Sequence, residues 1–314
     1  LQWYDPTIKV GYAFIANLIG SFATLLFLLP ELKVNIHFID LKLLRRIYAY
    51  SLPLLVVGLA GTVNEVADKI MLKMIIDNRS NALTQLGIYG ANYKLAMLMT
   101  IFIQMFRYAA EPFYFSKMKD KDAREVYATV MKYFILFGLS IFLVVMLYID
   151  IFKHFIGREF HAGLKIVPIV LTANLFLGIV YNLSIWYKLS NRTQYGAVIT
   201  LLGAGLTIGI NILLIPVYGY VGCAWATLIT YVTMFIVSYL LGRKFYYIPY
   251  EKGRILLYIL LAYSIFGVQF FIDYPGMILK IAINSLFLLL FFGVIIRTEK
   301  IRMKDIKAFF TRSE

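Results

Sequence analysis

Long apolar stretches constrain the fold of this chain more than any other feature. Nine segments approach the ~20 residues that a helix needs to cross a bilayer: 11–29, 50–76, 88–115, 126–149, 166–188, 195–216, 219–242, 255–272 and 277–296. Backbone groups inside a bilayer must be satisfied without water, and these segments lack the alternating polarity of barrel strands. The sequence therefore predicts an all-α integral membrane protein with nine transmembrane helices.

The charge of the chain supports this class and indicates an orientation. Only 15% of the 314 residues are charged, against ~25% in a soluble domain. The net charge of +14 could indicate nucleic acid, but the loops on one side hold 20 Lys and Arg and those on the other hold 5. Because basic residues gather in cytoplasmic loops, we expect an outside N-terminus, a cytoplasmic C-terminus and no nucleic-acid partner.

The start of the chain is unusual for a membrane protein. Leu1 stands where Met is expected, and the first apolar segment lacks the basic flank and the cleavage site of a signal peptide. We therefore expect that upstream helices are missing from this sequence.

The two longest basic segments lie at 30–50 and at 297–314. The first has an apolar helical face, formed by Ile39, Leu43, Leu44 and Ile47. This pattern predicts an interfacial helix, although these residues could also be the first turns of the next span. The second segment is expected to hold the last helix to anionic headgroups, with a specific protein partner as the alternative.

Two apolar segments, 50–76 and 88–115, carry seven charged residues: Glu65, Asp68, Lys69, Lys73, Lys94, Arg107 and Glu111. An ionisable side chain at the bilayer centre costs at least ~2.5–3.5 kcal/mol, so such residues usually face a bundle interior or a water-filled pathway. At 100° per residue, the charges of each segment gather on one side of the helix. The two helices are therefore predicted to wall a cavity for a polar substrate.

The expected topology divides these charges by depth. Glu65, Asp68, Lys69 and Lys94 form an outer cluster, while Arg107 and Glu111 form an inner pair.

Several of these charges have a simpler structural interpretation. The spacings of Glu65 with Lys69, and of Arg107 with Glu111, also suit ion pairs within one helix. Lys73, Lys132 and Lys280 could snorkel to the interface. Lys94 has no acidic residue at a pairing distance along its helix, so it needs a partner from elsewhere or a ligand.

Residue type suggests different roles within the predicted cavity. Basic side chains suit an anionic headgroup such as phosphate, and the candidates are Lys69, Lys94 and Arg107. Carboxylates beside basic groups can exchange a salt bridge for H⁺ or Na⁺, and the candidates for ion coupling are Glu65, Asp68 and Glu111. The expected cavity lining also includes Asn64, Asn92, Gln104, Asn174 and Asn182. We expect no catalytic residue, metal ligand or cofactor.

Glycine and proline positions predict local packing. Gly205 and Gly209 form a GxxxG pattern, which favours close helix contact. Pro53 lies early in a predicted span and could bend it.

Two motifs resemble a known family. The run Ile215–Thr227, IPVYGYVGCAWAT, resembles the P-x-Y-G-x-x-G-A-A-x-A-T hairpin of lipid-linked oligosaccharide flippases, with Cys223 in place of the usual Ala. The run Leu52–Lys69 resembles the first helix of the second lobe in the same proteins. These flippases carry O-antigen and capsular repeat units and belong to the multidrug/oligosaccharidyl-lipid/polysaccharide (MOP) exporter superfamily.

The resemblance implies the last nine helices of a MATE-like protein with fourteen helices in two lobes. Its implied parts are the last helix of the first lobe (1–29), a basic linker (30–50), a six-helix second lobe (51–242), two additional helices (243–296) and a basic tail (297–314). It further implies alternating access in the bacterial cytoplasmic membrane. The implied partners are a polyprenyl-diphosphate-linked glycan, membrane lipids and a missing N-terminal lobe.

Two other functions remain open on the sequence alone. A multidrug or cation antiporter of the same superfamily would prefer an acidic, aromatic cavity, against the basic surplus here. A membrane enzyme is disfavoured because the expected outer loops are short and His154 and His161 lack ligand spacing.

Overall fold

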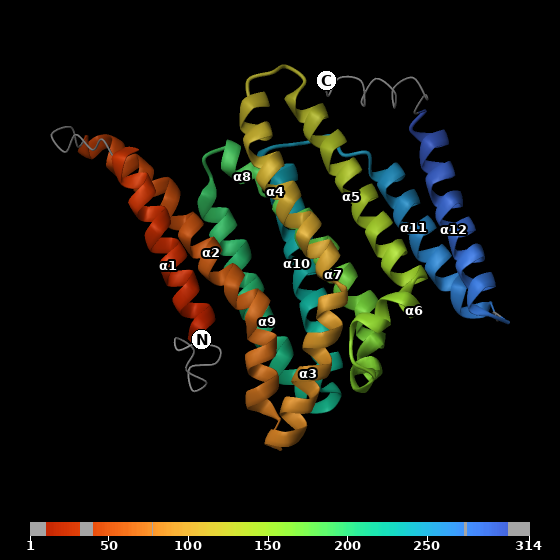
Figure 1. Ribbon diagram of the computed structural model, residues 1–314. Coiled ribbons are helices and arrows are strands. Elements are labelled where there is room, and N and C mark those ends of the chain that lie inside the picture. The colour runs from red at the N-terminus through yellow and green to blue at the C-terminus, as the bar shows by residue number, and fades with distance from the viewer. Residues whose placement is uncertain (1–10, 32–39, 77, 273–274, 301–314) are drawn as a thin grey trace. The chain divides into compact units, whose positions relative to one another are not determined.

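The computed structural model describes residues 11–31, 40–76, 78–272 and 275–300, which form helices and no strands (Figure 1). The all-α fold class is therefore confirmed for the described part of the chain. The contacts divide the chain into two compact units, Leu1–Ala49 and Tyr50–Glu314. Most of the predicted C-terminal tail lies outside the described residues, as does much of the predicted linker.

The first unit contains α1 (Gly11–Leu28), η1 (Leu29–Glu31) and the first turns of α2 (Leu41–Ile75). Asp40 caps α2, because its Oδ1 accepts hydrogen bonds from the backbone N–H groups of Lys42 at 2.8 Å and Leu43 at 3.2 Å. Helix α2 then continues through Pro53 without a break. Leu43, Leu44 and Ile47 thus lie on a helix that is continuous with the next span, which is the second of the two predicted alternatives, and Ile39 lies outside the described residues.

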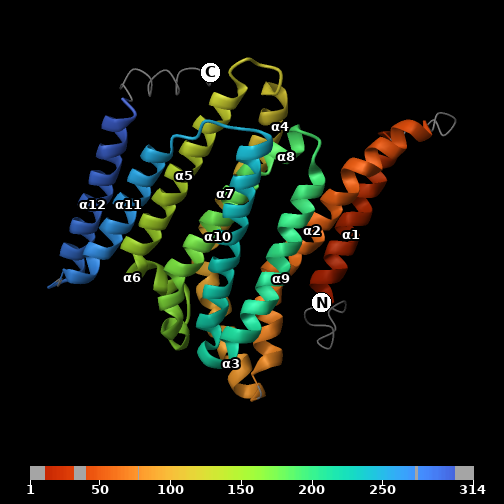
Figure 2. The ribbon, with the colours of Figure 1, turned by 180° about the vertical axis from the view of Figure 1, so that it is seen from behind.

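The second unit is a helical bundle. Its longer helices after α2 are α3 (Arg79–Leu95), α4 (Met97–Lys117), α5 (Ala123–Leu147), α7 (Val167–Leu183), α9 (Thr193–Tyr218), α10 (Tyr220–Phe245), α11 (Lys252–Val268) and α12 (Met277–Thr298). Short elements connect them: α6 (Ile149–Phe152), η2 (Lys153–Phe155), η3 (Arg158–Ile166), α8 (Ile185–Leu189) and η4 (Gln269–Phe271). Helix α7 packs against α4, α5 and α10, and α10 also packs against α9 (Figure 2). The buried core is centred on α7.

Seven helical segments among the described residues are long and apolar enough to cross a membrane. The bent pair α3 and α4 makes an eighth if it is one span. Helix α11 has 17 residues, the lower end of the ~17–25 that can span. The chain is a multi-pass membrane protein, and the count of nine spans stays a prediction.

The predicted helix at 88–115 is wrong in its bounds and its straightness. Helix α3 already begins at Arg79, where Asn78 Oδ1 accepts from the backbone N–H groups of Ser80 and Asn81. The helix axis bends by 54° between α3 and α4. Helical-wheel angles that relate Lys94 to Arg107 across this break therefore do not hold.

The connection between α9 and α10 is a one-residue turn at Gly219, whose φ of +54° favours glycine. A Cβ at Gly222 would lie 2.7 Å from the carbonyl oxygen of Leu214, so the two helices touch where the motif predicts. In contrast, a Cβ at Gly205 or Gly209 would meet no described atom within 4 Å. The GxxxG pattern therefore makes no close helix contact within the described residues.

We expect Gly222→Ala to destabilise the protein by roughly 1–3 kcal/mol, because the new methyl group would force α9 and α10 apart. The matched variant Gly205→Ala has free space and a better helix-forming residue, so it should be neutral or slightly stabilising. Thermal unfolding of both variants in detergent would test this contrast. Equal Tm values for the two would contradict the packing described here.

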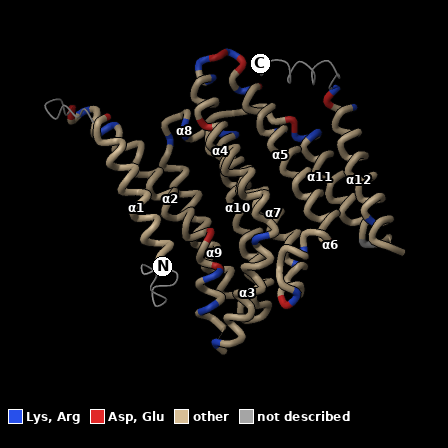
Figure 3. The backbone as a smooth tube through the Cα atoms, in the orientation of Figure 1, with Lys and Arg blue, Asp and Glu red and all other residues tan. Residues whose placement is uncertain are grey.

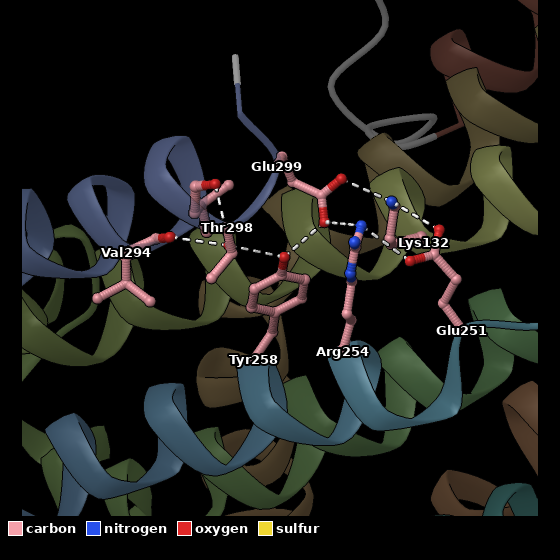
Figure 4. A network of polar contacts seen from close by, with 8 residues as sticks. Lys132, Glu251, Arg254, Tyr258, Val294, Thr298 and Glu299 are labelled. Atoms are coloured by element: carbon pink, nitrogen blue, oxygen red, sulfur yellow. Dashed lines mark hydrogen bonds and ion pairs between the residues drawn. The ribbon is translucent and has the colours of Figure 1, made fainter.

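A partly buried ion network holds α11 and α12 to α5 at one end of the bundle (Figure 4). Lys132 Nζ lies 2.8 Å from Glu251 Oε1 and 2.6 Å from Glu299 Oε2. Arg254 Nη1 lies 2.9 Å from Glu251, and Tyr258 donates a 2.5 Å hydrogen bond to Glu299. The side chains of Lys132 and Glu299 are only 5% and 4% exposed. Lys132 is therefore ion-paired inside the protein, and the snorkelling prediction for it is wrong.

The same network sets the ionisation of Glu299. Burial acts to raise the pKa of Glu299, but hydrogen bonds from Lys132 and Tyr258 outweigh it and hold the pKa below its ordinary value. The stabilisation is thus fully present above the unfolded-state pKa of ~4.3 and is lost as the pH falls through the lowered one.

A second group of ion pairs joins the opposite ends of α5 and α12. Asp150 follows α5, and its carboxylate lies 2.6 Å from Lys153 Nζ and 2.5 Å from Lys280 Nζ. Hydrogen bonds from Lys153 and then Lys280 hold the pKa of Asp150 below its ordinary value. Lys280 is therefore ion-paired as well, contrary to the snorkelling prediction. Ion pairs thus connect α12 to α5 or its flanking residues at both ends.

Candidate substrate cavity

Charged residues gather mainly at helix ends, but some lie along the middle of helices in the second unit (Figure 3). They contribute to two neighbouring clefts formed by α2, α3, α4, α7 and α8. We call the first, of about 200 Å³, the amide cleft, and its polar lining is Glu65, Lys69, Tyr93, Thr100, Gln104, Asn174 and Tyr181. We call the second, of about 20 Å³, the basic cleft, and its polar lining includes Arg107, Glu111, Tyr114, Asn182 and Lys188. Tyr181 lines both clefts.

Within the amide cleft, tyrosines connect the charged and amide groups. Lys69 Nζ lies 4.6 Å from the centre of the Tyr93 ring, a cation–π contact. The hydroxyl of Tyr93 donates to Asn174 Oδ1, and Asn174 Nδ2 donates to Thr100 Oγ1, both at 3.4 Å. These bonds are long, so the Asn174 amide is available to a better partner. Gln104 is half-buried, and its amide has no hydrogen bond to another described residue.

Tyr181 forms the junction between the two clefts. Its hydroxyl donates a long hydrogen bond of 3.5 Å to Glu65 Oε1. The Arg107 guanidinium lies 4.9 Å from the centre of its ring. One tyrosine thus places an acidic residue of α2 and a basic residue of α4 around a single aromatic ring.

The basic cleft contains one ion pair and two groups that could bind an anion. Glu111 Oε1 lies 2.6 Å from Lys188 Nζ. Arg107 makes no ion pair with a described residue, so the predicted alternative of an Arg107–Glu111 pair is not formed. The Asn182 side chain accepts from the Tyr114 hydroxyl at 2.9 Å, but its Nδ2 has no acceptor among the described residues. Such a buried, unsatisfied donor costs ~1–3 kcal/mol, which a ligand oxygen would recover.

The alternative of a Glu65–Lys69 side-chain pair is not formed either. Lys69 Nζ instead donates to the backbone carbonyl of Glu65 at 2.9 Å and lies 3.8 Å from Asp68 Oδ1. Lys69 therefore already has an acidic neighbour, whereas the Glu65 carboxylate has only the long bond from Tyr181.

Asp68 lies beside the amide cleft without lining it. The residue is 2% exposed, and Tyr89 donates a 2.5 Å hydrogen bond to its carboxylate from α3. The Cys223 thiol of α10 lies near the Asp68 carbonyl oxygen, at 3.7 Å. Asp68 is therefore shielded from solvent, and its carboxylate contacts Lys69 and Tyr89.

Besides Asp68, three more of the predicted site residues line neither cleft. Lys94 is exposed on the last turn of α3. Asn92 is fully buried and donates to the carbonyls of Ile88 and Phe160, both at 2.8 Å, so it joins α3 to η3. Asn64 accepts a 3.2 Å hydrogen bond from Thr207 and so joins α2 to α9.

Sequence reasoning missed the tyrosines and Lys188. Tyr181 follows Asn174 by seven residues and therefore lies on the same face of α7, which is a signal that could have identified it. The sequence pattern places Lys188 at the edge of a basic loop. The helix break at Ser184 redirects the chain, so that α8 brings Lys188 back to Glu111.

Comparison with known proteins identifies the fold. The family of polysaccharide biosynthesis proteins matches residues 1–119. The lipid II flippase MurJ, in an inward closed conformation, matches with a TM-score of 0.56 and 17% identity, over 90% of this chain and 61% of that one. A MOP-superfamily transporter from Pyrococcus furiosus, described as having a binding pocket of reverse polarity, matches with a TM-score of 0.52 and 17% identity, over 71% and 52%. No curated protein sequence matches.

The predicted resemblance to MOP-superfamily transporters is therefore confirmed, and these structural neighbours are transporters rather than enzymes. The chain spans between 52% and 61% of the length of these two solved structures.

Proposed function

Because the chain has the fold of MOP-superfamily transporters and matches polysaccharide biosynthesis proteins over residues 1–119, we propose that it is part of a flippase. Its substrate would be a polyprenyl-diphosphate-linked oligosaccharide, moved across the bacterial cytoplasmic membrane by alternating access. The described helices would form one wall of the cavity. A first lobe, equivalent to the part of the solved neighbours that this chain does not cover, would form the other. The loop charges favour an outside N-terminus and a cytoplasmic C-terminus.

The main support for this proposal comes from the hydrogen-bond donors that line the basic cleft. Arg107 has no carboxylate partner among the described residues, and Asn182 offers a buried N–H without an acceptor. Lys188 lines the same cleft, where it pairs with Glu111. Arginine and lysine are the usual partners of phosphate. A multidrug or cation antiporter would need an excess of acidic side chains in its cavity. The flippase is therefore the better-supported function.

Ligand-induced stabilisation of the intact protein in detergent tests this function. We expect farnesyl diphosphate, a short-chain probe with the proposed headgroup, to raise the Tm in a concentration-dependent way. Tetraphenylphosphonium, a lipophilic cation, should leave the Tm unchanged. Stabilisation by the cation and not by the diphosphate would instead favour the antiporter.

We further propose that Glu65 and Asp68 couple transport to an H⁺ or Na⁺ gradient, with Glu111 as a third candidate. Glu65 lines the cleft, and Asp68 contacts Lys69 and Tyr89, two contacts that protonation of its carboxylate would weaken. Glu65→Gln and Asp68→Asn should lose the dependence of export on the gradient, as measured with ionophores. If both variants keep the ionophore sensitivity of the unmodified protein, neither residue couples an ion.

A further inference from the structure

Basic side chains surround the last two turns of α10. The guanidinium group of Arg192, just before α9, lies 4.2 Å from the centre of the Phe245 ring, and Lys244 Nζ lies 5.6 Å from the same centre. Lys252 Nζ, at the start of α11, lies 5.2 Å from the centre of the Tyr239 ring. Aromatic faces attract cations within about 6 Å. These rings therefore hold three cations close to the same end of α10.

The chain that follows α10 is anchored to its neighbours. Residues 246–251 connect α10 to α11 (Figure 2). Ile248 is 5% exposed and belongs to a small buried core with Tyr127 of α5 and Ile185 of α8. The segment after α10 is thus fixed against α5 and α8. The basic and aromatic side chains around it therefore form one defined surface.

The cations of this surface have no carboxylate partners. Among the described residues, four basic side chains at this end of α10 make no ion pair: Arg192, Arg243, Lys244 and Lys252. The nearby Glu251 already pairs with Lys132 and Arg254. Arg124 of α5 has two acidic neighbours in sequence, Asp122 and Glu125, so it adds little to the excess. The surface therefore has a strong positive charge that the protein itself does not offset.

Hydroxyl groups accompany these cations. Four tyrosines line a small cleft beside Arg243: Tyr239, Tyr246, Tyr247 and Tyr250. Their hydroxyls make no hydrogen bond with a described residue, and Tyr247 is 54% exposed. Arginine, lysine and tyrosine all donate hydrogen bonds, and donors of positive charge bind phosphate oxygens most strongly. The surface thus offers several donors to a phosphate group.

The position of the surface favours a membrane lipid as the source of that phosphate. Helix α10 is long and apolar enough to cross a membrane, and it ends at Phe245. The surface therefore lies where a span leaves the hydrocarbon, at the depth where aromatic and basic side chains meet headgroups. The loop charges favour the cytoplasmic side for this end. Each basic residue near an anionic membrane surface raises affinity by ~5-fold.

We propose that this surface binds the phosphate of an anionic phospholipid, such as phosphatidylglycerol, in the adjacent leaflet. Its binding residues are Arg192, Arg243, Lys244, Lys252 and Tyr247. The aromatic rings pre-organise the cations, so less side-chain freedom is lost when the lipid binds. The surface lies outside both clefts, so lipid binding here is independent of the transported substrate.

Titration of short-chain probes into the intact protein in detergent tests this proposal. Dioctanoyl phosphatidylglycerol should bind and raise the Tm. Dioctanoyl phosphatidylcholine has the same chains but no net charge, and it should bind at least ~10-fold more weakly. Glycerol phosphate and hexaglutamate should also bind more weakly. They represent a soluble phosphate and an acidic protein segment, the two other sources of negative charge.

Two variants and a matched control locate the binding site. Arg192→Gln combined with Lys244→Gln removes both cations from the Phe245 ring and should lower phosphatidylglycerol affinity by ~10- to 25-fold. Lys119→Gln combined with Lys121→Gln removes the same charge from the loop between α4 and α5, where neither lysine contacts a described aromatic ring. This control should lose no more than ~3-fold.

The variant Tyr247→Phe protects the test against a folding defect. It removes only a hydroxyl from a half-exposed side chain, so the Tm without lipid should stay unchanged. Its affinity for phosphatidylglycerol should fall by ~3-fold or more.

Four results would overturn the proposal. Equal losses in the two double variants would show that only the net charge matters. Equal binding of phosphatidylcholine or of glycerol phosphate would exclude an anionic-lipid site. Binding of hexaglutamate without binding of phosphatidylglycerol would assign the surface to an acidic protein. Loss of lipid binding in Arg107→Ala, with normal binding in the Arg192 and Lys244 double variant, would place the lipid in the basic cleft.

Discussion

An Arg107→Ala variant should export no glycan in cells, while its abundance in the membrane stays unchanged. Arg107 is exposed in the cleft and makes no ion pair with a described residue, so its removal should cost little stability. Removal of the Arg107 side chain should greatly weaken binding of the diphosphate. Hydrogen bonds to charged groups contribute ~1.5–3 kcal/mol each, so the loss of even one reduces diphosphate affinity by ~10- to 150-fold.

Three comparison variants show whether this effect belongs to the site. Arg107→Lys keeps the positive charge but loses the bidentate hydrogen bonding of the guanidinium group, so this variant should retain partial export. Arg124→Ala removes an arginine that stacks on Tyr246 outside both clefts, and it should export normally. Lys94→Ala should also have a small effect, because Lys94 lines neither cleft in this structure. Complete loss of export in Lys94→Ala, with normal export in Arg107→Ala, would reverse the assignment.

A Lys132→Met variant should destabilise the protein by about 3–5 kcal/mol, the largest stability effect that we expect at any single position. Its side chain is 5% exposed and is the shared partner of Glu251 and Glu299. Removal leaves the buried Glu299 with only the Tyr258 hydroxyl and a longer contact of 3.6 Å to Arg254. Chemical or thermal unfolding of the purified protein would measure the loss.

A double variant distinguishes an unpaired charge from simple loss of packing. Lys132→Met combined with Glu299→Gln removes both buried charges, while Glu251 keeps its 2.9 Å contact with Arg254. The double variant should therefore be more stable than Lys132→Met alone, since no buried charge then lacks a partner. If the two substitutions were simply additive, the ion network would not be the source of the stability.

The sequence is sufficient to predict the fold class, and it also predicts that several charged residues lie on one polar pathway. Charges inside apolar segments are so rare that the sequence alone assigns Glu65, Lys69 and Arg107 to a polar pathway. The structure brings these three residues to the two adjoining clefts.

Local signals did not reveal the break in the predicted third span. The break at Ala96 lies in the apolar run Leu95–Met97, without a Pro or Gly to mark it. The angular position of Lys94 was therefore wrong relative to Arg107.

The sequence also gives no signal for ion pairs between residues that are far apart along the chain. Lys132 is 119 residues from Glu251 and 167 from Glu299, so no spacing rule along one helix could have joined them. The same reason explains why Lys188 was not matched to Glu111. A lysine near a helix end is therefore predicted to snorkel, because the sequence does not show which neighbouring helix holds its ion-pair partner.

Transport by the intact protein in sealed vesicles would show whether the chain is part of a flippase. A fluorescent farnesyl-diphosphate-linked N-acetylglucosamine, loaded in the inner leaflet, would be followed by quenching from outside. We expect saturable translocation that bare farnesyl diphosphate inhibits and that Arg107→Ala abolishes. Absence of translocation, together with gradient-driven movement of tetraphenylphosphonium through the same vesicles, would contradict it.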